Sequence, residues 1–273
     1  MPQPLPLENI VPEVLLIARA AGAAILAIYT RHCESSGADV ALPDKADASP
    51  LTEADLAAHH LICDRLERLT PQLRVVSEED VESHTQLAPT AEFWLIDPLD
   101  GTREFLARNG EFTVNIALVC DGAVRLGVVY APVADRMYWG ARTLGAFRDT
   151  GAGAEPIRVA DEPPAGRPWR VVASKSHLNA ETIDFVGGLG HVELIQAGSS
   201  LKFCRLAEGM ADVYPRLGPT CQWDTAAAQG VLEGAGGRVV DLAGQALRYG
   251  GSERLNPHFV ASSGALEARN GGA

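Results

Sequence analysis

The 273-residue sequence has few cysteines, few aromatic residues and a deficit of positive charge. Its five cysteines form no C-x-x-C pair, and an odd number cannot all be bridged, so we expect no disulfide framework and a reducing cytoplasm. No histidine and cysteine cluster with metal-ligand spacing occurs. Lys and Arg total 23 against 35 Asp and Glu, a net charge of −12. Nucleic-acid binding needs a basic face, so it is not expected.

Long apolar runs are also missing. No stretch of eighteen or more apolar residues occurs, and the N-terminus lacks a basic segment followed by an apolar one. We therefore expect neither a secretion signal nor a transmembrane segment, with loose peripheral membrane association left open. A hydrophobic content of 47% with 21% charged residues is ordinary for a globular enzyme, built as one large domain or two intimate lobes. The sequence leaves monomer and homodimer open.

The first half predicts two helices and a run of strands. Apolar residues at helical spacing predict a helix over residues 8–30. Thr52, with Asp55 three residues later, is typical of a capping box that opens a second helix. Five strands are expected, over residues 74–76, 93–96, 113–119, 124–130 and 136–140. Asp121-Gly122 predicts a hairpin turn between the third and fourth.

The second half alternates strands with helices, which is typical of an α/β layer around a mixed sheet. The expected order is strand 170–173, helix 180–187, strand 191–195, helix 200–208, strand 211–214, helix 223–233 and strand 238–241. The glycine-rich stretch 150–154 is the predicted boundary between an N-terminal lobe (1–150) and a C-terminal lobe (151–273).

The most informative segment is DPLDGT at residues 97–102, directly after a short apolar strand. Pro98 restricts the backbone, so the carboxylates of Asp97 and Asp100 and the carbonyl of Leu99 can converge on one point. Hard oxygen donors of this kind suit Mg²⁺. The amides of Gly101 and Thr102 suit a phosphate oxygen. The segment therefore indicates metal-assisted phosphate chemistry.

Two further carboxylates lie at comparable places. Glu78 follows the strand over 74–76, and Asp224 stands where a helix is expected to begin. Asp97, Asp100, Glu78 and Asp224 are the predicted metal ligands, whereas Glu79 is as easily assigned to solvent as to a metal. The alternative is that the two aspartates only make turn hydrogen bonds.

These motifs resemble the inositol monophosphatase superfamily of Mg²⁺-dependent, often lithium-inhibited phosphatases. Further segments are similar to its CysQ-type 3′(2′),5′-bisphosphate nucleotidases, namely SPLTEAD at 49–55, REF at 103–105, GEFTVNI at 110–116, GSSLKFC at 198–204 and VYPRLGPT at 213–220. The resemblance covers about residues 10–262. Ala228 departs from it, because the family has glycine at the end of its Trp-Asp-x-Ala-Ala-Gly run.

The resemblance implies a five-layer αβαβα sandwich with the active site between the lobes. It also implies two or three Mg²⁺ ions, with Asp97 bridging two of them. Glu78 and the Leu99 carbonyl would complete one site, and Asp100 and Asp224 the second. Thr102 and Asp55 would orient the attacking water, although Asp55 also fits a purely structural capping role.

Substrate selection is expected in the second half. Lys202 and Arg216 are isolated cations in apolar settings, which suits a second phosphate that the metals do not hold. Ser174, His177 and Ser199 could hydrogen-bond the same phosphate, the ribose or the base. Three structural alternatives remain: Ser199 or Ser200 as a helix N-cap, Lys202 on a solvated face, and His177 in a plain loop.

The predicted reaction, by resemblance, is removal of the 3′-phosphate from adenosine 3′,5′-bisphosphate to give AMP and phosphate. This compound is a by-product of sulfate activation, and the 3′-phosphorylated sulfate donor is a second candidate substrate. The enzymatic alternative is hydrolysis of inositol-1-phosphate or fructose-1,6-bisphosphate at the same metal site. The non-enzymatic alternative is a nucleotide or metal sensor, which would show damage in the water-activating group; Thr102, Asp55, Glu78 and Asp97 are intact.

Overall fold

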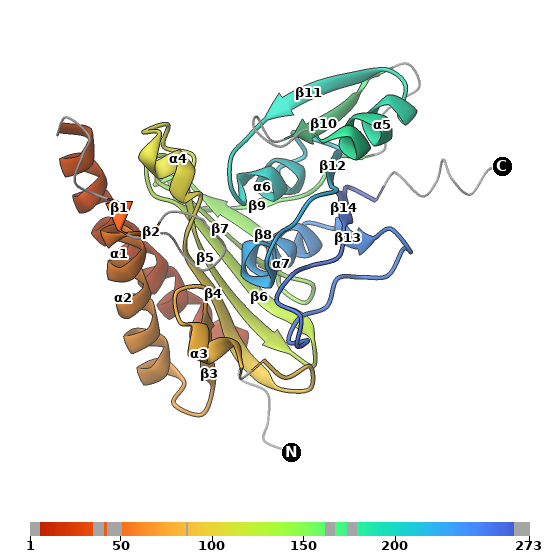
Figure 1. The fold of residues 1–273 in the computed structure, drawn as a ribbon. Coiled ribbons are helices and arrows are strands. Elements are labelled where there is room, and N and C mark those ends of the chain that lie inside the picture. Colours follow the sequence, from red (N-terminus) through yellow and green to blue (C-terminus); the bar gives the residue numbers. More distant parts are fainter. Residues whose placement is uncertain are drawn as a thin grey trace.

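The computed structural model describes residues 6–34, 41–42, 51–85, 87–161, 167–173 and 179–264. Three layers of helices alternate with two β-sheets, which gives five layers in all (Figure 1). Helices α1 (Leu7–Glu34) and α2 (Glu53–Leu69) cover the outer face of a seven-stranded sheet, and α6 (Leu201–Ala207) and α7 (Ala226–Gly234) lie between it and a five-stranded sheet. Helix α5 (Ala180–Gly188) covers the far side of that second sheet. This confirms the predicted αβαβα layering.

The seven-stranded sheet keeps its strands in chain order. They are β3 (Arg74–Ser77), β4 (Glu92–Asp100), β5 (Thr113–Cys120), β6 (Ala123–Ala131), β7 (Arg136–Ala141), β8 (Gly145–Asp149) and β9 (Ala154–Ile157). Only the β3–β4 pair is parallel. Asp121 and Gly122 have φ of 49° and 74°, the left-handed backbone of a tight hairpin turn, so the predicted hairpin is confirmed.

The five-stranded sheet has the order β11-β10-β12-β14-β13. Its members are β10 (Trp169–Ala173), β11 (Val192–Gln196), β12 (Val213–Arg216), β13 (Arg238–Asp241) and β14 (Phe259–Ser262). Strands β10, β11 and β12 are parallel, because the chain returns through helices, and β14 runs antiparallel to β12 and β13. The remaining elements are short: β1 (Ala41–Leu42), β2 (Leu51–Thr52), α3 (Val81–His84), α4 (Thr102–Leu106) and the 3₁₀ turn η1 (Gln222–Asp224).

Strands β8, β9 and β14 were not expected from the sequence. The stretch 150–154, the predicted lobe boundary, lies between β8 and β9, and Gly151 and Gly153 there have positive φ. The first sheet therefore extends to Ile157, beyond that boundary. Small, polar turn residues signal a chain reversal equally well within a sheet and between lobes, so composition alone does not separate the two cases.

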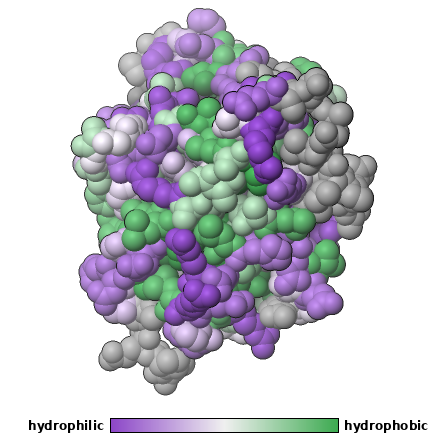
Figure 2. Space-filling model, turned by 90° about the vertical axis from the view of Figure 1, so that its left-hand side faces the viewer, coloured by the Kyte–Doolittle hydropathy of each residue, from purple (hydrophilic) through white to green (hydrophobic). Residues whose placement is uncertain are grey.

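Helix α1 is long and apolar enough to cross a membrane by length and composition, and an 18-residue window within it has a mean hydropathy of 1.9. One side of it is buried in the core shared with α2 and the first sheet, through Val14, Ala18, Ala21 and Ile25 among others. Figure 2, which faces the side where α1 and α2 lie in Figure 1, shows apolar atoms in patches between hydrophilic ones. A core helix of a soluble protein passes the same test of length and hydropathy, and 44% of the apolar window is buried here.

Helix α7 lies unusually close to the first sheet. A Cβ added at Gly230 would fall 2.7 Å from the backbone nitrogen of Gly127 on β6, so neither position has room for a side chain. The alanines 226–228 beside this contact are buried. The small residues at the start of α7 therefore serve close packing.

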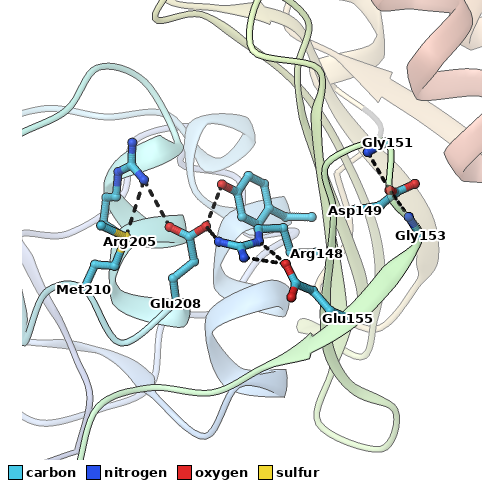
Figure 3. Close-up of polar contacts among 9 residues, drawn as sticks. Arg148, Asp149, Gly151, Gly153, Glu155, Arg205, Glu208 and Met210 are labelled. Carbon is cyan, nitrogen blue, oxygen red and sulfur yellow. Dashed lines mark hydrogen bonds and ion pairs between the residues drawn. The ribbon is translucent and has the colours of Figure 1, made fainter.

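A buried carboxylate ties α6 to the first sheet (Figure 3). Glu208, directly after α6, has a side chain only 2% exposed, and accepts hydrogen bonds from Arg148 of β8 at 2.7 Å and from the Tyr138 hydroxyl of β7 at 2.9 Å. Arg205 of α6 lies 3.2 Å from its second oxygen. The charge is thus fully paired, as burial requires. This network fixes the helix that carries Lys202.

Candidate active site

Three carboxylates from different elements converge at the edge of the first sheet. Asp97 lies within β4, Glu78 directly follows β3, and Asp224 ends η1. One ligand atom of each lies within 4.8 Å of the others. Parallel pairing of β3 with β4, extended by the Glu78 amide donating to the carbonyl of Ile96 at 3.1 Å, brings the first two together. The sequence prediction of Glu78, Asp97 and Asp224 as one group thus has a geometric basis.

Asp97 is 1% exposed and sits at an irregularity of β4. Asp97 pairs with Asn115 and Asp100 with Thr113, so three steps on β4 face two on β5. Pro98, which cannot donate to the ladder, accounts for the extra residue. The Leu99 amide donates to Asp97 Oδ1 at 3.0 Å. The turn hydrogen bond considered as an alternative therefore exists alongside the carboxylate cluster.

Asp100 borders the cluster without joining the group of three. Its Oδ2 accepts from the Thr113 hydroxyl at 3.3 Å and from the Asn115 amide at 3.4 Å. Asn115 Nδ2 also donates to Ser200 Oγ at 2.9 Å, and Ser200 donates to the carbonyl of Asp224 at 3.0 Å. A chain of polar side chains therefore links Asp100 to the Asp224 turn.

Asp224 is held in an electrostatically unfavourable place. Its Oδ2 accepts from the Cys221 amide at 2.9 Å, which fixes the turn. Burial, and next the negative charges of Glu78 and Asp100, raise the pKa of Asp224 well above its usual range. A bound cation would relieve this repulsion, so the donor set fits Mg²⁺: carboxylate oxygens with no thiol or imidazole among them.

These carboxylates line a cleft of about 470 Å³. One wall is the segment 99–104, which includes Gly101, Thr102, Arg103 and Glu104. The opposite wall comes from the second half of the chain, through Arg216, the segment 219–221 and the pair Arg254 and Leu255. The cleft therefore lies where the first sheet meets the second half, as expected from the sequence.

Thr102 and Asp55 are in contact. The Thr102 hydroxyl donates to Asp55 Oδ1 at 3.3 Å, and both residues are buried. Asp55 Oδ2 accepts from the amide of Thr52 at 2.9 Å and from its hydroxyl, the capping box of α2. The predicted capping role is therefore confirmed, and the second oxygen of the same carboxylate points to Thr102.

Lys202 and Arg216 lie together beside the cleft, around a smaller hollow of about 130 Å³ that also touches Asp100 and Asp224. The Lys202 ammonium lies 5.7 Å from the Tyr214 ring centroid. Burial, and next the charge of Arg216, lower its pKa, with Asp100 opposing them. Arg216 donates through Nη2 to the carbonyl of Pro219 at 2.8 Å, while its Nε is buried without a partner among the described residues.

The other predicted substrate residues divide into two groups. Ser174 and His177 lie outside the described residues. Ser199 borders the small hollow, but its Oγ lies 2.8 Å from the carbonyls of both Asp100 and Glu111, so its hydroxyl bonds the protein backbone. Ser200 is the N-cap residue directly before α6, and it makes no side-chain cap hydrogen bond. Glu79 lies outside the three-carboxylate group.

Sequence reasoning missed the wall formed by Arg254 and Leu255. This loop is held to the Asp224 turn by two buried amides: Gln222 Nε2 donates to the carbonyl of Glu253 at 2.6 Å, and Asn256 Nδ2 to that of Cys221 at 2.7 Å. Leu255 is 49% exposed despite being apolar. Only a leucine-asparagine-proline run marked the loop, and it carries no chemical signal by itself.

Comparison with known proteins agrees with this architecture. The chain is 46% identical over 251 residues to the 3′(2′),5′-bisphosphate nucleotidase CysQ of Escherichia coli K12, covering 92% of this chain and 98% of that protein. CysQ of Haemophilus influenzae is 33% identical, over 93% and 92%.

Solved structures show the same fold. A CysQ from Bacteroides thetaiotaomicron superposes with a TM-score of 0.77 at 39% identity, covering 90% of this chain and 94% of the other. An IMPase from Thermotoga maritima, 23% identical, superposes with a TM-score of 0.75 over 96% and 94%. The model of the inositol monophosphatase family matches residues 10–271, which include every carboxylate of the cleft. The chain therefore belongs to the inositol monophosphatase family.

Proposed function

We propose that this chain is a 3′(2′),5′-bisphosphate nucleotidase that removes the 3′-phosphate of adenosine 3′,5′-bisphosphate. One observation carries the proposal: the three-carboxylate group and the Lys202–Arg216 pair open onto the same cleft region. The first suits metal-bound phosphate, and the second suits another phosphate of the same molecule. The CysQ relatives, whose printed names state this activity, support it.

Glu78, Asp97 and Asp224 would hold Mg²⁺, with Asp100 and the Leu99 carbonyl completing the donor set. We propose two or three ions. When bound, Mg²⁺ neutralises phosphoryl oxygens and lowers the pKa of a coordinated water. Phosphate monoesters hydrolyse so slowly in water that strong stabilisation of the phosphoryl charge is needed, which bound Mg²⁺ would supply.

Thr102 would position the attacking water. Because its hydroxyl hydrogen is directed to Asp55, the Thr102 oxygen keeps its lone pairs free to accept a hydrogen bond from water. Asp55 cannot turn away, since the capping box holds its other oxygen. This fixed acceptor would orient the attacking water and stabilise the positive charge on the hydrogen that the water gives up.

Gly101 and Thr102 would place their amides against the scissile phosphate. Both residues line the cleft directly after Asp100. Gly101 has a φ of +97°, which only glycine adopts without strain, so the turn that aims these amides depends on it.

The second phosphate, at the 5′ position, would bind Lys202 and Arg216. The buried Arg216 Nε has no partner among the described residues, and an unpaired buried donor is costly unless a ligand meets it. Burial lowers the pKa of the Lys202 amine, and a phosphate bound beside it would favour the charged form. Inositol-1-phosphate has no second phosphate to meet these groups.

The proposal is tested by phosphate release with Mg²⁺ from three substrates: adenosine 3′,5′-bisphosphate, inositol-1-phosphate and fructose-1,6-bisphosphate. We expect kcat/KM for the nucleotide to exceed the others about a hundredfold, which corresponds to about 2.7 kcal/mol of transition-state binding. Comparable rates on all three would contradict the nucleotide assignment and leave a general phosphatase. No turnover of any substrate would contradict the enzymatic assignment itself.

A further inference from the structure

His84, at the end of α3, lies between the two segments that bring Glu78 and Asp224 together. Its imidazole stacks on the indole of Trp223, with ring centroids 4.6 Å apart and an interplanar angle of 28°. Its Nε2 lies 2.8 Å from the carbonyl oxygen of Ser77. A carbonyl only accepts, so Nε2 carries a hydrogen and donates it.

In each of the two contacts, His84 touches the residue that immediately precedes a carboxylate of the site. Ser77 precedes Glu78, and Trp223 precedes Asp224. One side chain therefore joins the end of β3 in the first sheet to η1, which leads into α7. The carboxylates that follow lie within 4.8 Å of each other.

This link opposes an electrostatic repulsion between the two segments. Glu78 follows β3, an edge strand whose one partner among the described strands is β4. Carboxylate oxygens of Glu78 and Asp224 lie within 4.8 Å of each other, so like charges there repel the two segments before a cation binds. Separation of the segments would weaken metal binding, because part of the binding free energy would then be used to draw them together.

Two other contacts of Ser77 hold the end of β3 but do not connect it to η1. His59 of α2 lies 2.8 Å from the Ser77 hydroxyl, and the Ser77 amide donates to Ser83 Oγ at 3.2 Å. These hold the end of β3 to α2 and α3. The contact of His84 also reaches η1 through the stacked indole.

We propose that His84 is a positioning residue of the metal site: its stack on Trp223 and its hydrogen bond to Ser77 hold Glu78 and Asp224 at ligand separation. The inference rests on the metal site of the proposed function, but not on the identity of the substrate. It assigns His84 no contact with the reacting atoms.

The test measures Mn²⁺ binding without substrate, by electron paramagnetic resonance, in four variants. His84→Ala removes both contacts, His84→Phe keeps an aromatic stack without the donor, and His84→Gln keeps an N–H donor without the ring. His191→Ala is the control, because His191 is exposed and lies before β11, in the other sheet. Outer contacts of metal ligands commonly contribute ten- to a hundredfold to affinity.

We expect His84→Ala to bind Mn²⁺ about tenfold more weakly, with His84→Phe and His84→Gln between it and the wild type. The Mg²⁺ concentration for half-maximal phosphatase activity should rise in parallel, while kcat at saturating Mg²⁺ stays within about twofold. His191→Ala should match the wild type in every measurement.

Unchanged Mn²⁺ affinity in His84→Ala would overturn the inference, as would a loss of kcat at saturating Mg²⁺ with affinity unchanged. If His84→Ala fails to fold by circular dichroism, the Phe and Gln variants decide, and wild-type affinity in both would overturn it. Failure of the nucleotide assignment would appear only in the substrate comparison, because Mn²⁺ binding is read without substrate.

Discussion

The hydroxyl of Ser199 occupies the space that a side chain on Gly101 would need. A Cβ at Gly101 would clash with Ser199 Oγ, which lies 2.8 Å from the carbonyls of Asp100 and Glu111. Gly101 and Ser199 are both in left-handed backbone conformations, with φ of 97° and 45°. The turn at Gly101 and the segment before α6 therefore constrain each other's conformation.

Gly101→Ala should lower the free energy of unfolding by about 2 kcal/mol or more, from left-handed strain plus the clash with Ser199. It should also reduce kcat, because the turn aims the Thr102 amide. Ser199→Gly in the same chain should recover part of the stability, since it removes the clash but not the strain. Urea denaturation of both single variants and the double variant gives the coupling energy. Strict additivity would contradict the fit described here.

Asp97→Asn should abolish phosphatase activity, by at least about a thousandfold, while leaving the fold intact. An amide oxygen is similar in size but carries no charge, so it would hold Mg²⁺ far more weakly than a carboxylate does. Activity with Mg²⁺ and the number of bound Mn²⁺ ions are the measurements. Asp121→Asn, at the exposed hairpin turn, is the matched control, because asparagine also tolerates its positive φ. Wild-type turnover in Asp97→Asn would refute the metal assignment.

The pH dependence of kcat/KM for the bisphosphate should show the titration of Lys202. Burial and Arg216 lower the pKa of Lys202 below its ordinary value of 10.5, so it loses its charge at a lower pH than an exposed lysine. The charged form binds the second phosphate, so kcat/KM for the bisphosphate should fall as pH rises through this pKa. A 3′-monophosphate, which lacks the 5′ group, should not show this limb.

Lys202→Met is the control for that profile. It should raise KM for the bisphosphate at neutral pH by about tenfold or more and remove the alkaline limb. Its effect on inositol-1-phosphate should be small. Equal effects on both substrates would place Lys202 outside the second phosphate site.

Glu208→Gln should lower the free energy of unfolding by about 3 kcal/mol, because Arg148 and Arg205 lose a carboxylate that is only 2% exposed. Glu155→Gln removes the other partner of Arg148, which is 51% exposed, and should change stability by less than about 1 kcal/mol. Chemical denaturation of the two variants compares them directly. Equal losses would show that burial does not decide the strength of this network.

The local features of the site could be read from the sequence. Thr52 and Asp55 form the predicted capping box, and the DPLDGT segment forms the end of β4 and the turn after it. These features depend on residues within a few positions of each other, whose backbone preferences are expressed locally. The role of Ser199 could not be read this way. A serine before a helix is typical of an N-cap, and its actual hydrogen bonds go to carbonyls about a hundred residues away in the chain.

The sequence by itself determined most of the helices and strands, the carboxylates available for metal and the cations available for a second phosphate, because apolar periodicity and side-chain chemistry are properties of the chain. The five-layer arrangement was expected only from the family resemblance. The tertiary structure decided which of them meet. It brought Asp224 to within 4.8 Å of Glu78 and Asp97, set His84 between their segments, and closed the cleft with Arg254 and Leu255. Such contacts depend on how the two sheets pack around α6 and α7, and long-range packing leaves no periodic signal in the sequence.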